Sequence, residues 1–219
     1  MRETRRHSLI FLLALITALS GLWIFIRLTG QVLKGKTQLF DERIVRSLRE
    51  PDAPELPIGP WWLPEMARDL TALGSHTLLA LITILASGFL YLEKKHHSMW
   101  LIITATSSGL LLNILLKVFF GRRRPSVVPP LSWVTMPGFP SGHAMLSVIV
   151  YLSLGFLLAR SRPSGKTKIY IFGMALLLSF LVGLSRVYLG VHYPTDVAAG
   201  WIGGLVWFLL IWLIWPQHW

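Results

Sequence analysis

The chain has 219 residues, of which 53% are hydrophobic and only 14% charged, and it contains no cysteine. Soluble domains typically carry about 25% charged residues, so this composition excludes an ordinary soluble globule. The lack of cysteine excludes disulfides, thiolate nucleophiles and cysteine-ligated zinc. The formal net charge of +11 is typical of proteins that meet nucleic acid or an anionic membrane surface, and in so apolar a chain it favours the membrane.

Six apolar segments are long enough for membrane helices. A bilayer core of about 30 Å requires about 20 residues per helix. The expected spans are residues 8–28, 70–92, 99–120, 141–160, 168–189 and 195–215. We therefore expect an all-α fold in which residues 1–219 form one integral-membrane bundle of six transmembrane helices. The first segment could instead be a signal peptide, because Ala18-Leu19-Ser20 resembles a cleavage site, but its uninterrupted length favours a retained anchor.

The last expected span carries two glycines, Gly200 and Gly204, at four-residue spacing. Small residues at this spacing lie on one face of a membrane helix and let a neighbouring helix approach closely. Such pairs are common in membrane helices. The pair nevertheless indicates a tight helix contact in the last span.

A short amphipathic segment follows the first span. Phe40, Ile44 and Leu48 recur at four-residue spacing with Val45 beside them, which predicts a helix over residues 39–50. This helix would lie either in the membrane interface or on the surface of the bundle. Five prolines between positions 51 and 64 then predict irregular structure. The charged residues expected on the polar side of the helix are Asp41, Glu42, Arg43, Arg46 and Arg49.

The number of spans determines which loops lie on the same side of the membrane. With six spans, both termini lie on one side of the membrane, and the loops after the first, third and fifth spans lie on the other. The short turns on the side of the termini are basic, so the positive-inside rule makes that side cytoplasmic. This holds if the arginines in the loop between the third and fourth spans, on the opposite side, are left out of the count because they serve chemistry. The basic residues of these turns are Lys94, Lys95, Arg160, Arg162, Lys166 and Lys168.

Polar residues at the ends of membrane spans are costly, which makes them functional candidates. Four span ends that open on the side away from the termini carry such residues. Topology therefore collects three cations, two imidazoles and a carboxylate on one face of the membrane. The residues in question are Lys117, Arg124, Ser141, Gly142, His143, Arg186, His192 and Asp196.

The three cations and the start of the fourth span could bind an anion together. Lys117, Arg124 and Arg186 supply positive charge and forked donors that match phosphate oxygens. Ser141 and Gly142 open a helix, where unpaired backbone N–H groups and the helix dipole hold an anion. Together these residues predict a phosphate cradle.

The histidines suit a reaction on that phosphate. His192 and Asp196 are four residues apart, so on one helical turn the carboxylate can fix the imidazole tautomer and leave the other nitrogen free to attack. His143 is a second imidazole that can donate a proton. The set fits phosphoryl transfer through a phosphohistidine without a metal.

Each motif alone has a simpler interpretation. Three successive arginines commonly mark topology or lipid headgroups, so Arg122 and Arg123 are interpreted as headgroup or surface contacts. Ser-Gly-His is commonly a helix start, and a His and an Asp four apart can form a structural hydrogen bond. The five histidines without such neighbours are interpreted as interfacial or structural: His7, His76, His96, His97 and His218.

Taken in order, the motifs resemble the tripartite signature of the type-2 phosphatidic acid phosphatase family. Six residues separate Lys117 from Arg124-Pro125, Pro140 precedes Ser141-Gly142-His143, and five residues separate Ser185-Arg186 from His192. The resemblance implies that His192 is the nucleophile, that Asp196 orients it, and that His143 protonates the leaving group and then activates water. It implies that the remaining matched residues bind phosphate oxygens: Lys117, Arg124, Ser141, Gly142 and Arg186.

The resemblance also implies an activity. We expect a hydrolase that releases phosphate from a lipid phosphate or lipid pyrophosphate without a metal or cofactor, with vanadate as a mimic of its transition state. Undecaprenyl pyrophosphate, phosphatidylglycerophosphate and phosphatidic acid fit equally well. The expected partners are this lipid and the bilayer, with no nucleic acid. A phosphotransferase using the same phosphohistidine, and a headgroup transporter or scramblase without hydrolysis, are the alternatives.

The expected location follows from the same resemblance and from the charge pattern. We expect a protein of the bacterial inner or plasma membrane with both termini in the cytoplasm. The active site would then face the periplasm or the cell exterior.

Overall fold

The computed structural model describes residues 2–215. Over that range the chain is almost entirely helical, with one short antiparallel pair of strands, β1 and β2. In chain order the elements are α1 (Arg2–Leu33), α2 (Gln38–Ser47), β1 (Arg49–Glu50), β2 (Ala53–Pro57), α3 (Leu63–Ala72), α4 (His76–Leu92), α5 (His96–Phe120), α6 (Gly142–Arg160), α7 (Gly165–Tyr188) and α8 (Pro194–Ile214).

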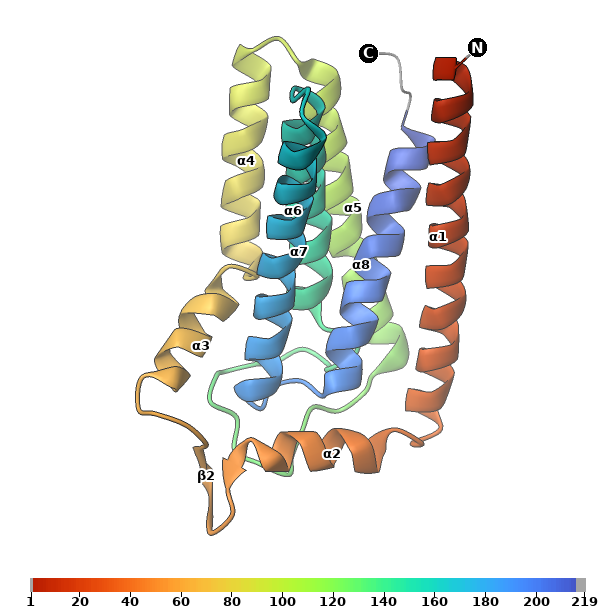
Figure 1. The fold of residues 1–219 in the computed structure, drawn as a ribbon. Helices are drawn as coiled ribbons and strands as arrows, with labels where there is room; N and C mark the ends of the chain where they lie inside the picture. The colour runs from red at the N-terminus through yellow and green to blue at the C-terminus, as the bar shows by residue number, and fades with distance from the viewer. Residues whose placement is uncertain (1, 216–219) are drawn as a thin grey trace.

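The long helices run side by side and form a bundle with two distinct ends (Figure 1). Both termini and the turns after α4 and α6 lie at one end, while α2, α3 and the strands gather at the other. Among the described residues, five helices are long and apolar enough to cross a membrane, or six if α3 and α4 count as one bent span. The fold is thus the expected all-α bundle of an integral membrane protein.

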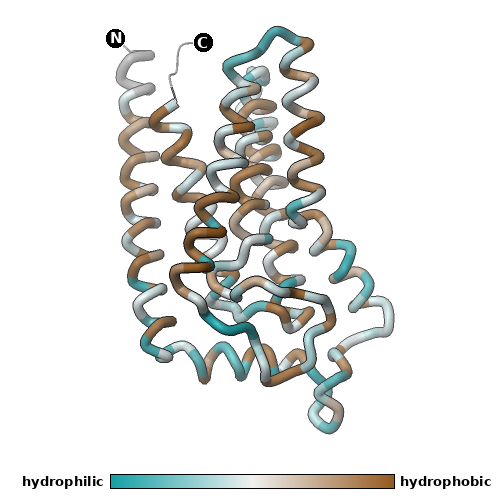
Figure 2. The backbone as a smooth tube through the Cα atoms, turned by 180° about the vertical axis from the view of Figure 1, so that it is seen from behind, coloured by the Kyte–Doolittle hydropathy of each residue, from teal (hydrophilic) through white to brown (hydrophobic). Residues whose placement is uncertain are grey.

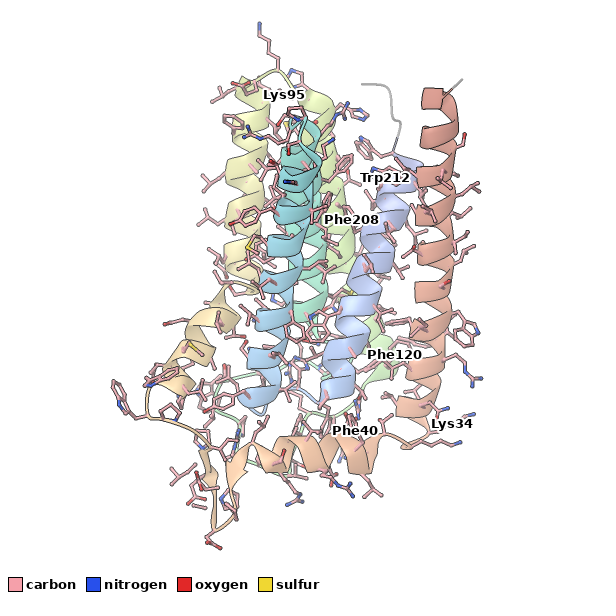
Figure 3. All side chains as sticks on the ribbon, viewed as in Figure 1. Lys34, Phe40, Lys95, Phe120, Phe208 and Trp212 are labelled. Atoms are coloured by element: carbon pink, nitrogen blue, oxygen red, sulfur yellow. The ribbon has the colours of Figure 1, made fainter. Side chains whose placement is uncertain are left out.

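Hydropathy follows this geometry. Apolar residues dominate the length of the bundle, and hydrophilic residues concentrate at its ends and along α2 (Figure 2). The labelled side chains mark the same division: Lys95 lies at the end that carries the termini, and Lys34 and Phe40 lie at the opposite end (Figure 3). A membrane slab perpendicular to the helices therefore leaves both ends in contact with water.

Helix α6 forms the centre of the bundle. Within its most apolar window, 72% of the residues are buried inside the protein, against 6% for α1. It packs against α4, α5, α7 and α8, and its buried side chains Met145, Ile149 and Leu152 share one core with Leu79 and Phe208. The start of α6 is therefore held rigidly from several sides.

Two glycines bring α8 into direct contact with the first turns of α6. A Cβ atom at Gly200 would lie 2.6 Å from the carbonyl oxygen of Ser141, and one at Gly204 would lie 2.5 Å from that of Met145. No side chain fits these spaces, so only glycine permits this approach. The expected tight helix contact is confirmed, and it joins the starts of α6 and α8.

The second expected span, residues 70–92, is wrong as a single helix. Helix α3 ends at Ala72 and α4 begins at His76, with a bend of 44° between them. Ser75 caps the new helix by accepting a hydrogen bond from the N–H of Leu78 at 3.2 Å. A Cβ atom at Gly74 would lie 2.3 Å from Val182 of α7, so the break also allows close packing.

The loop between α1 and α3 also departs from expectation. Helix α2 ends at Ser47 rather than at residue 50, and Arg49–Glu50 pairs with Ala53–Pro57 in a region where the prolines predict no regular structure. Asp41, expected on the polar side of α2, is fully buried, whereas Phe40 is 56% exposed. The inward face of α2 is set by Asp41 and Val45, because both pack toward the start of α8.

Candidate active site

The structure brings the predicted site residues to the end of the bundle opposite the termini. The cations come from three separate segments: Lys117 from the last turn of α5, Arg124 from the loop that follows, and Arg186 from the last turn of α7. The start of α6 supplies Ser141, Gly142 and His143, and the start of α8 supplies Asp196, with His192 just before it.

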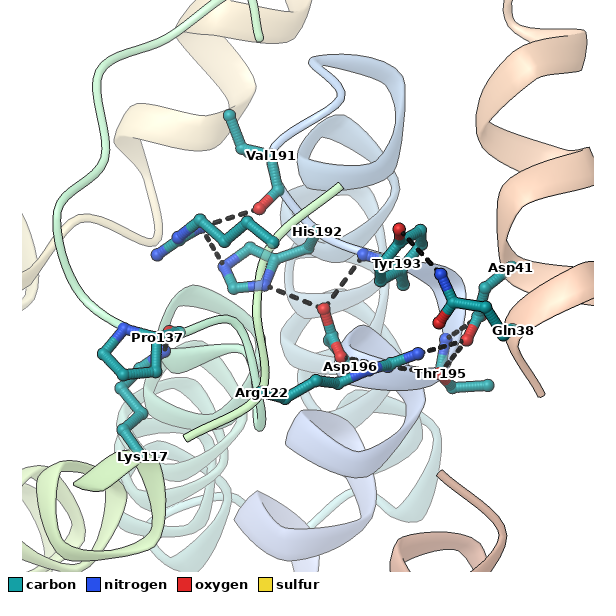
Figure 4. Close-up of polar contacts among 11 residues, drawn as sticks. Gln38, Asp41, Lys117, Arg122, Pro137, Val191, His192, Tyr193, Thr195 and Asp196 are labelled. Carbon is teal, nitrogen blue, oxygen red and sulfur yellow. Dashed lines mark hydrogen bonds and ion pairs between the residues drawn. The ribbon is translucent and has the colours of Figure 1, made fainter. Parts of the chain in front are cut away.

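His192 faces a polar group at each ring nitrogen, with a hydrogen bond at Nε2 and an ion-pair contact without a hydrogen bond at Nδ1. Nη1 of Arg124 lies 3.1 Å from Nε2, and an Oδ2 atom of Asp196 lies 3.5 Å from Nδ1. An arginine can only donate hydrogen bonds, so Nε2 must accept one and carries no proton. The proton therefore resides on Nδ1, facing Asp196, and the lone pair of Nε2 faces the arginine (Figure 4).

The surroundings of His192 keep it neutral. Its side chain is 1% exposed, and burial lowers its pKa well below the ordinary value, with Arg124, Arg186 and Lys117 acting in the same direction. A neutral imidazole retains the lone pair that a nucleophile needs. The site thus holds His192 in a reactive protonation state at neutral pH.

The three predicted cations converge from separate elements, and each is oriented by an oxygen atom. Lys117 Nζ donates to the carbonyl of Pro137 at 2.6 Å, and Arg124 Nε donates to that of Met136 at 2.7 Å. Arg186 Nη1 donates to the hydroxyl of Thr71 at 3.0 Å. Lys117 and Arg186 are almost completely buried. Buried cations without carboxylates of their own are arranged to receive an anion.

Unpaired donors complete this cradle. Within the part of the chain that the structure describes, Ser141 Oγ and Arg186 Nε are buried and have no hydrogen-bond partner. The first N–H groups of α6, at Gly142 and His143, have no partner inside the helix because of helix geometry. Buried polar groups are normally paired, so these donors fit the oxygen atoms of a phosphate.

The interpretation of the remaining histidines is correct in part. His96 and His97 lie at the end of the bundle that carries the termini, in contact with aromatic rings, as structural residues do. His218 and the side chain of His7 lie outside the described residues. His76, which was interpreted in the same way, does have a site residue as a neighbour, because the start of α4 places it against His143.

His76 packs edge-on against His143, with the ring centroids 5.6 Å apart. A Cβ atom at Gly142 would lie 3.3 Å from its Nε2 atom, so His76 stands beside the start of α6. His143 in turn lies within electrostatic range of Arg186, His192 and His76. The helix break before His76, which the cap at Ser75 signals, is what turns this side chain toward the cradle.

Arg122 is a second residue that sequence reasoning missed. Its side chain is only 10% exposed and pairs with both Asp41 and Asp196, so it is not a headgroup or surface contact. Arg123, beside it, is exposed as expected. A buried acidic partner 81 residues earlier distinguishes the two arginines, and the sequence carries no local signal for that pairing.

The chemistry of this donor set fits phosphate without an added cation. Three protein cations, Lys117, Arg124 and Arg186, already supply positive charge to the cradle. Over the described residues, no three His, Asp or Glu side chains come together as a metal would require.

Comparison with known proteins adds independent evidence. Residues 97–219, which include every predicted site residue, match the model of the PAP2 superfamily. Phosphatidylglycerophosphatase B of Bacillus subtilis is 33% identical over 192 residues, which cover 85% of this chain and 89% of that protein. Lipid A 1-phosphatase of Rhizobium etli is 30% identical over 186 residues, covering 72% of this chain and 75% of its own length.

A solved structure resembles the whole bundle. The crystal structure of a transmembrane PAP2-type phosphatidylglycerolphosphate phosphatase from Bacillus subtilis superposes with a TM-score of 0.80. The two chains are 31% identical, and the match covers 89% of this chain and 94% of the other. The likeness therefore includes the helices outside the site as well as those that build it.

Proposed function

The chain belongs to the PAP2 superfamily and is a membrane lipid phosphatase, and we propose that His192 is its nucleophile, with the roles of the other site residues as follows. Phosphate oxygens bind Lys117, Arg124 and Arg186. The hydroxyl of Ser141 and the N–H groups at the start of α6 supply the remaining donors.

The first step forms a bond between Nε2 of His192 and phosphorus. The bond from phosphorus to the leaving oxygen breaks, and that oxygen takes its proton from His143. Asp196 accepts a hydrogen bond from Nδ1–H and stabilises the positive charge that develops on the ring. The products of this step are the lipid alcohol, or a lipid monophosphate from a pyrophosphate, and a phosphohistidine.

The second step returns the enzyme to its starting state. His143, now without its proton, accepts one from a water molecule, and the water oxygen attacks phosphorus. The bond between phosphorus and Nε2 of His192 breaks, inorganic phosphate leaves, and His143 is protonated again. The cations of the cradle stabilise the charge on the equatorial oxygens in both steps.

One observation carries this proposal: Arg124 donates to Nε2 of His192 while Asp196 faces Nδ1. The contact supports Nε2 as the nitrogen that attacks, because it leaves that lone pair beside a cation of the cradle. Substitution of His192 by Asn tests it, because Asn keeps a polar group near Nδ1 and removes Nε2. Phosphate release from a lipid phosphate should then be undetectable in a folded variant, whereas full activity would exclude His192 as the nucleophile.

We propose phosphatidylglycerophosphate as the first substrate to test, because the relative of that name shares 33% identity over most of both chains. Phosphate release in detergent micelles should be compared among phosphatidylglycerophosphate, phosphatidic acid, undecaprenyl pyrophosphate and p-nitrophenyl phosphate. We expect the highest kcat/KM with phosphatidylglycerophosphate. A higher value with the pyrophosphate would reassign the substrate, and equal turnover of the water-soluble ester would contradict a lipid site.

We also propose that both termini face the cytoplasm and that the site faces outward. The basic turn residues lie at the end that carries the termini, which supports this orientation (Figure 3). Because the chain has no cysteine, single cysteines report topology cleanly. An impermeant maleimide should label Trp133→Cys in intact cells and Lys95→Cys only after permeabilisation, and the reverse pattern would invert the orientation.

A further inference from the structure

A buried chain of polar contacts continues from Asp196 to the far side of the cradle. Arg122 donates from Nη1 to Oδ1 of Asp196 and, at 2.9 Å, to the hydroxyl of Thr195. Its Nη2 atom donates to Oδ2 of Asp41 at 2.7 Å (Figure 4). One guanidinium group thus joins two buried carboxylates.

Asp41 belongs to α2 and fastens that helix to the start of α8. Its Oδ1 atom accepts the backbone N–H of Thr195 at 3.1 Å, and its Oδ2 atom accepts the Thr195 hydroxyl at 2.6 Å. Both Asp41 and Asp196 are fully buried. A buried carboxylate is costly without a cation beside it, so each of the two depends on Arg122.

The contacts divide the two oxygen atoms of Asp196 between separate tasks. Oδ1 is bound by Arg122, while Oδ2 lies 3.5 Å from Nδ1 of His192 and accepts the backbone N–H of Tyr193 at 3.0 Å. With both ends held, the carboxylate cannot rotate away from the imidazole. We propose that Arg122 is a positioning residue of the reaction, which holds Asp196 against His192 and is itself held by Asp41.

The charge balance supports this role. Burial lowers the pKa of Arg122, but the adjacent charges and hydrogen bonds of Asp196 and Asp41 outweigh it and raise the pKa overall. Arg122 therefore stays cationic. Asp196 also acts electrostatically on Lys117 and Arg124, so without Arg122 it would be drawn toward the cradle cations and away from His192.

The geometry separates this role from phosphate binding. Both terminal nitrogens of Arg122 are engaged by carboxylates, and the guanidinium carbon lies 4.7 Å from the ring centre of Tyr193. Nη1 also donates to the Thr195 hydroxyl, so the terminal nitrogens of this guanidinium are directed at protein groups and not at the cradle. Arg123 is exposed and offers a matched control with the same charge in the same loop.

The inference rests on the proposed roles of His192 and Asp196, and the test measures those first. Asp196→Asn should lose most activity; if it does not, the proposed mechanism fails and not only this inference. Arg122→Gln should then lower kcat about 10- to 100-fold, the range expected when a group that orients a reacting residue is removed. KM for the lipid phosphate and inhibition by vanadate should change less than about threefold.

A double-mutant cycle provides the decisive readout. In the Asp196→Asn background, Arg122→Gln should cause no further loss of kcat, because its partner is already gone. Losses that multiply would show that Arg122 acts elsewhere and would overturn the proposal. A large rise in KM with unchanged kcat would make it a substrate ligand instead, and Arg123→Gln should retain wild-type kinetics.

Two further variants keep the test valid if Arg122→Gln does not fold. Arg122→Lys keeps the charge between the carboxylates but cannot bind both with a fork, so we expect a folded protein with reduced kcat and unchanged KM. Asp41→Asn keeps the shape of α2 and should lower kcat in the same way. Full activity in either variant would contradict the proposal.

Discussion

Nη1 of Arg124 lies 3.1 Å from Nε2 of His192, and the same nitrogen also donates to the carbonyl of Val191 at 2.7 Å. The cation is thus anchored to the backbone beside the histidine whose lone pair it faces. A phosphate bound by Arg124 therefore meets Nε2 directly. This contact places the two roles that we propose for the site, phosphate binding and nucleophilic attack, in one pair of side chains.

The buried, neutral state of His192 predicts how stability depends on pH. The folded pKa lies well below the ordinary 6.5, so below pH 6.5 the unfolded chain binds a proton that the folded protein does not. Stability should therefore fall as the pH falls, by about 1.4 kcal/mol at pH 5.5 relative to neutral pH.

The His192→Asn variant isolates this effect, because all other groups titrate in both proteins. Its thermal midpoint in detergent should fall less between pH 7.5 and pH 5.5 than that of the wild type. Equal shifts in the two proteins would mean that His192 is protonated in the folded state.

The contact of α8 with α6 predicts a difference between neighbouring glycines. A Cβ atom at Gly204 would lie 2.5 Å from a backbone carbonyl, whereas one at Gly203 would lie 3.4 Å from the ring of Phe25. Gly204→Ala should destabilise the protein by about 1–3 kcal/mol through overpacking. Gly203→Ala should be neutral or stabilising, since alanine favours a helix interior by about 1 kcal/mol over glycine. Thermal unfolding of both variants in detergent measures the difference, and equal behaviour would contradict the close packing.

The hydroxyl of Thr71 predicts a contribution to phosphate binding, because it orients Arg186 from α3 at 3.0 Å. Thr71→Val removes the acceptor and keeps the shape, so KM for a lipid phosphate should rise about 3- to 10-fold, as expected for one lost hydrogen bond. Thr71→Ser retains the hydroxyl and should behave as the wild type. An unchanged KM in Thr71→Val would show that Arg186 is positioned without α3.

The convergence of the site could be predicted because it depends on chain topology alone. Consecutive spans cross the membrane in opposite directions, so the ends of α5 and α7 and the starts of α6 and α8 lie at one membrane face, whatever the details of packing. Polar residues at those ends, such as Lys117 and His192, are too costly in a membrane to be incidental. Glycines four residues apart likewise predicted the contact of α8.

The role of Arg122 could not be predicted, because it depends on which side chains the tertiary fold buries. In sequence it is one of three successive arginines, and its partner Asp41 lies 81 positions away in a helix of uncertain orientation. The amphipathic pattern placed Phe40 on the apolar side of this helix and Asp41 on its polar side, but the fold buries Asp41 in an ion pair with Arg122 and leaves Phe40 exposed. His76 was missed for a related reason, since an apolar run conceals a helix break that only the Gly74-Ser75 pair indicates.

The most direct test of the account is to trap the phosphoenzyme. Purified protein should be mixed with a lipid phosphate labelled at phosphorus, quenched during turnover in base, and digested for mass spectrometry. We predict an acid-labile phosphoryl group on Nε2 of His192 that is absent from His192→Asn. Rapid phosphate release with no phosphohistidine, or with the phosphoryl group on another residue, would contradict the central claim.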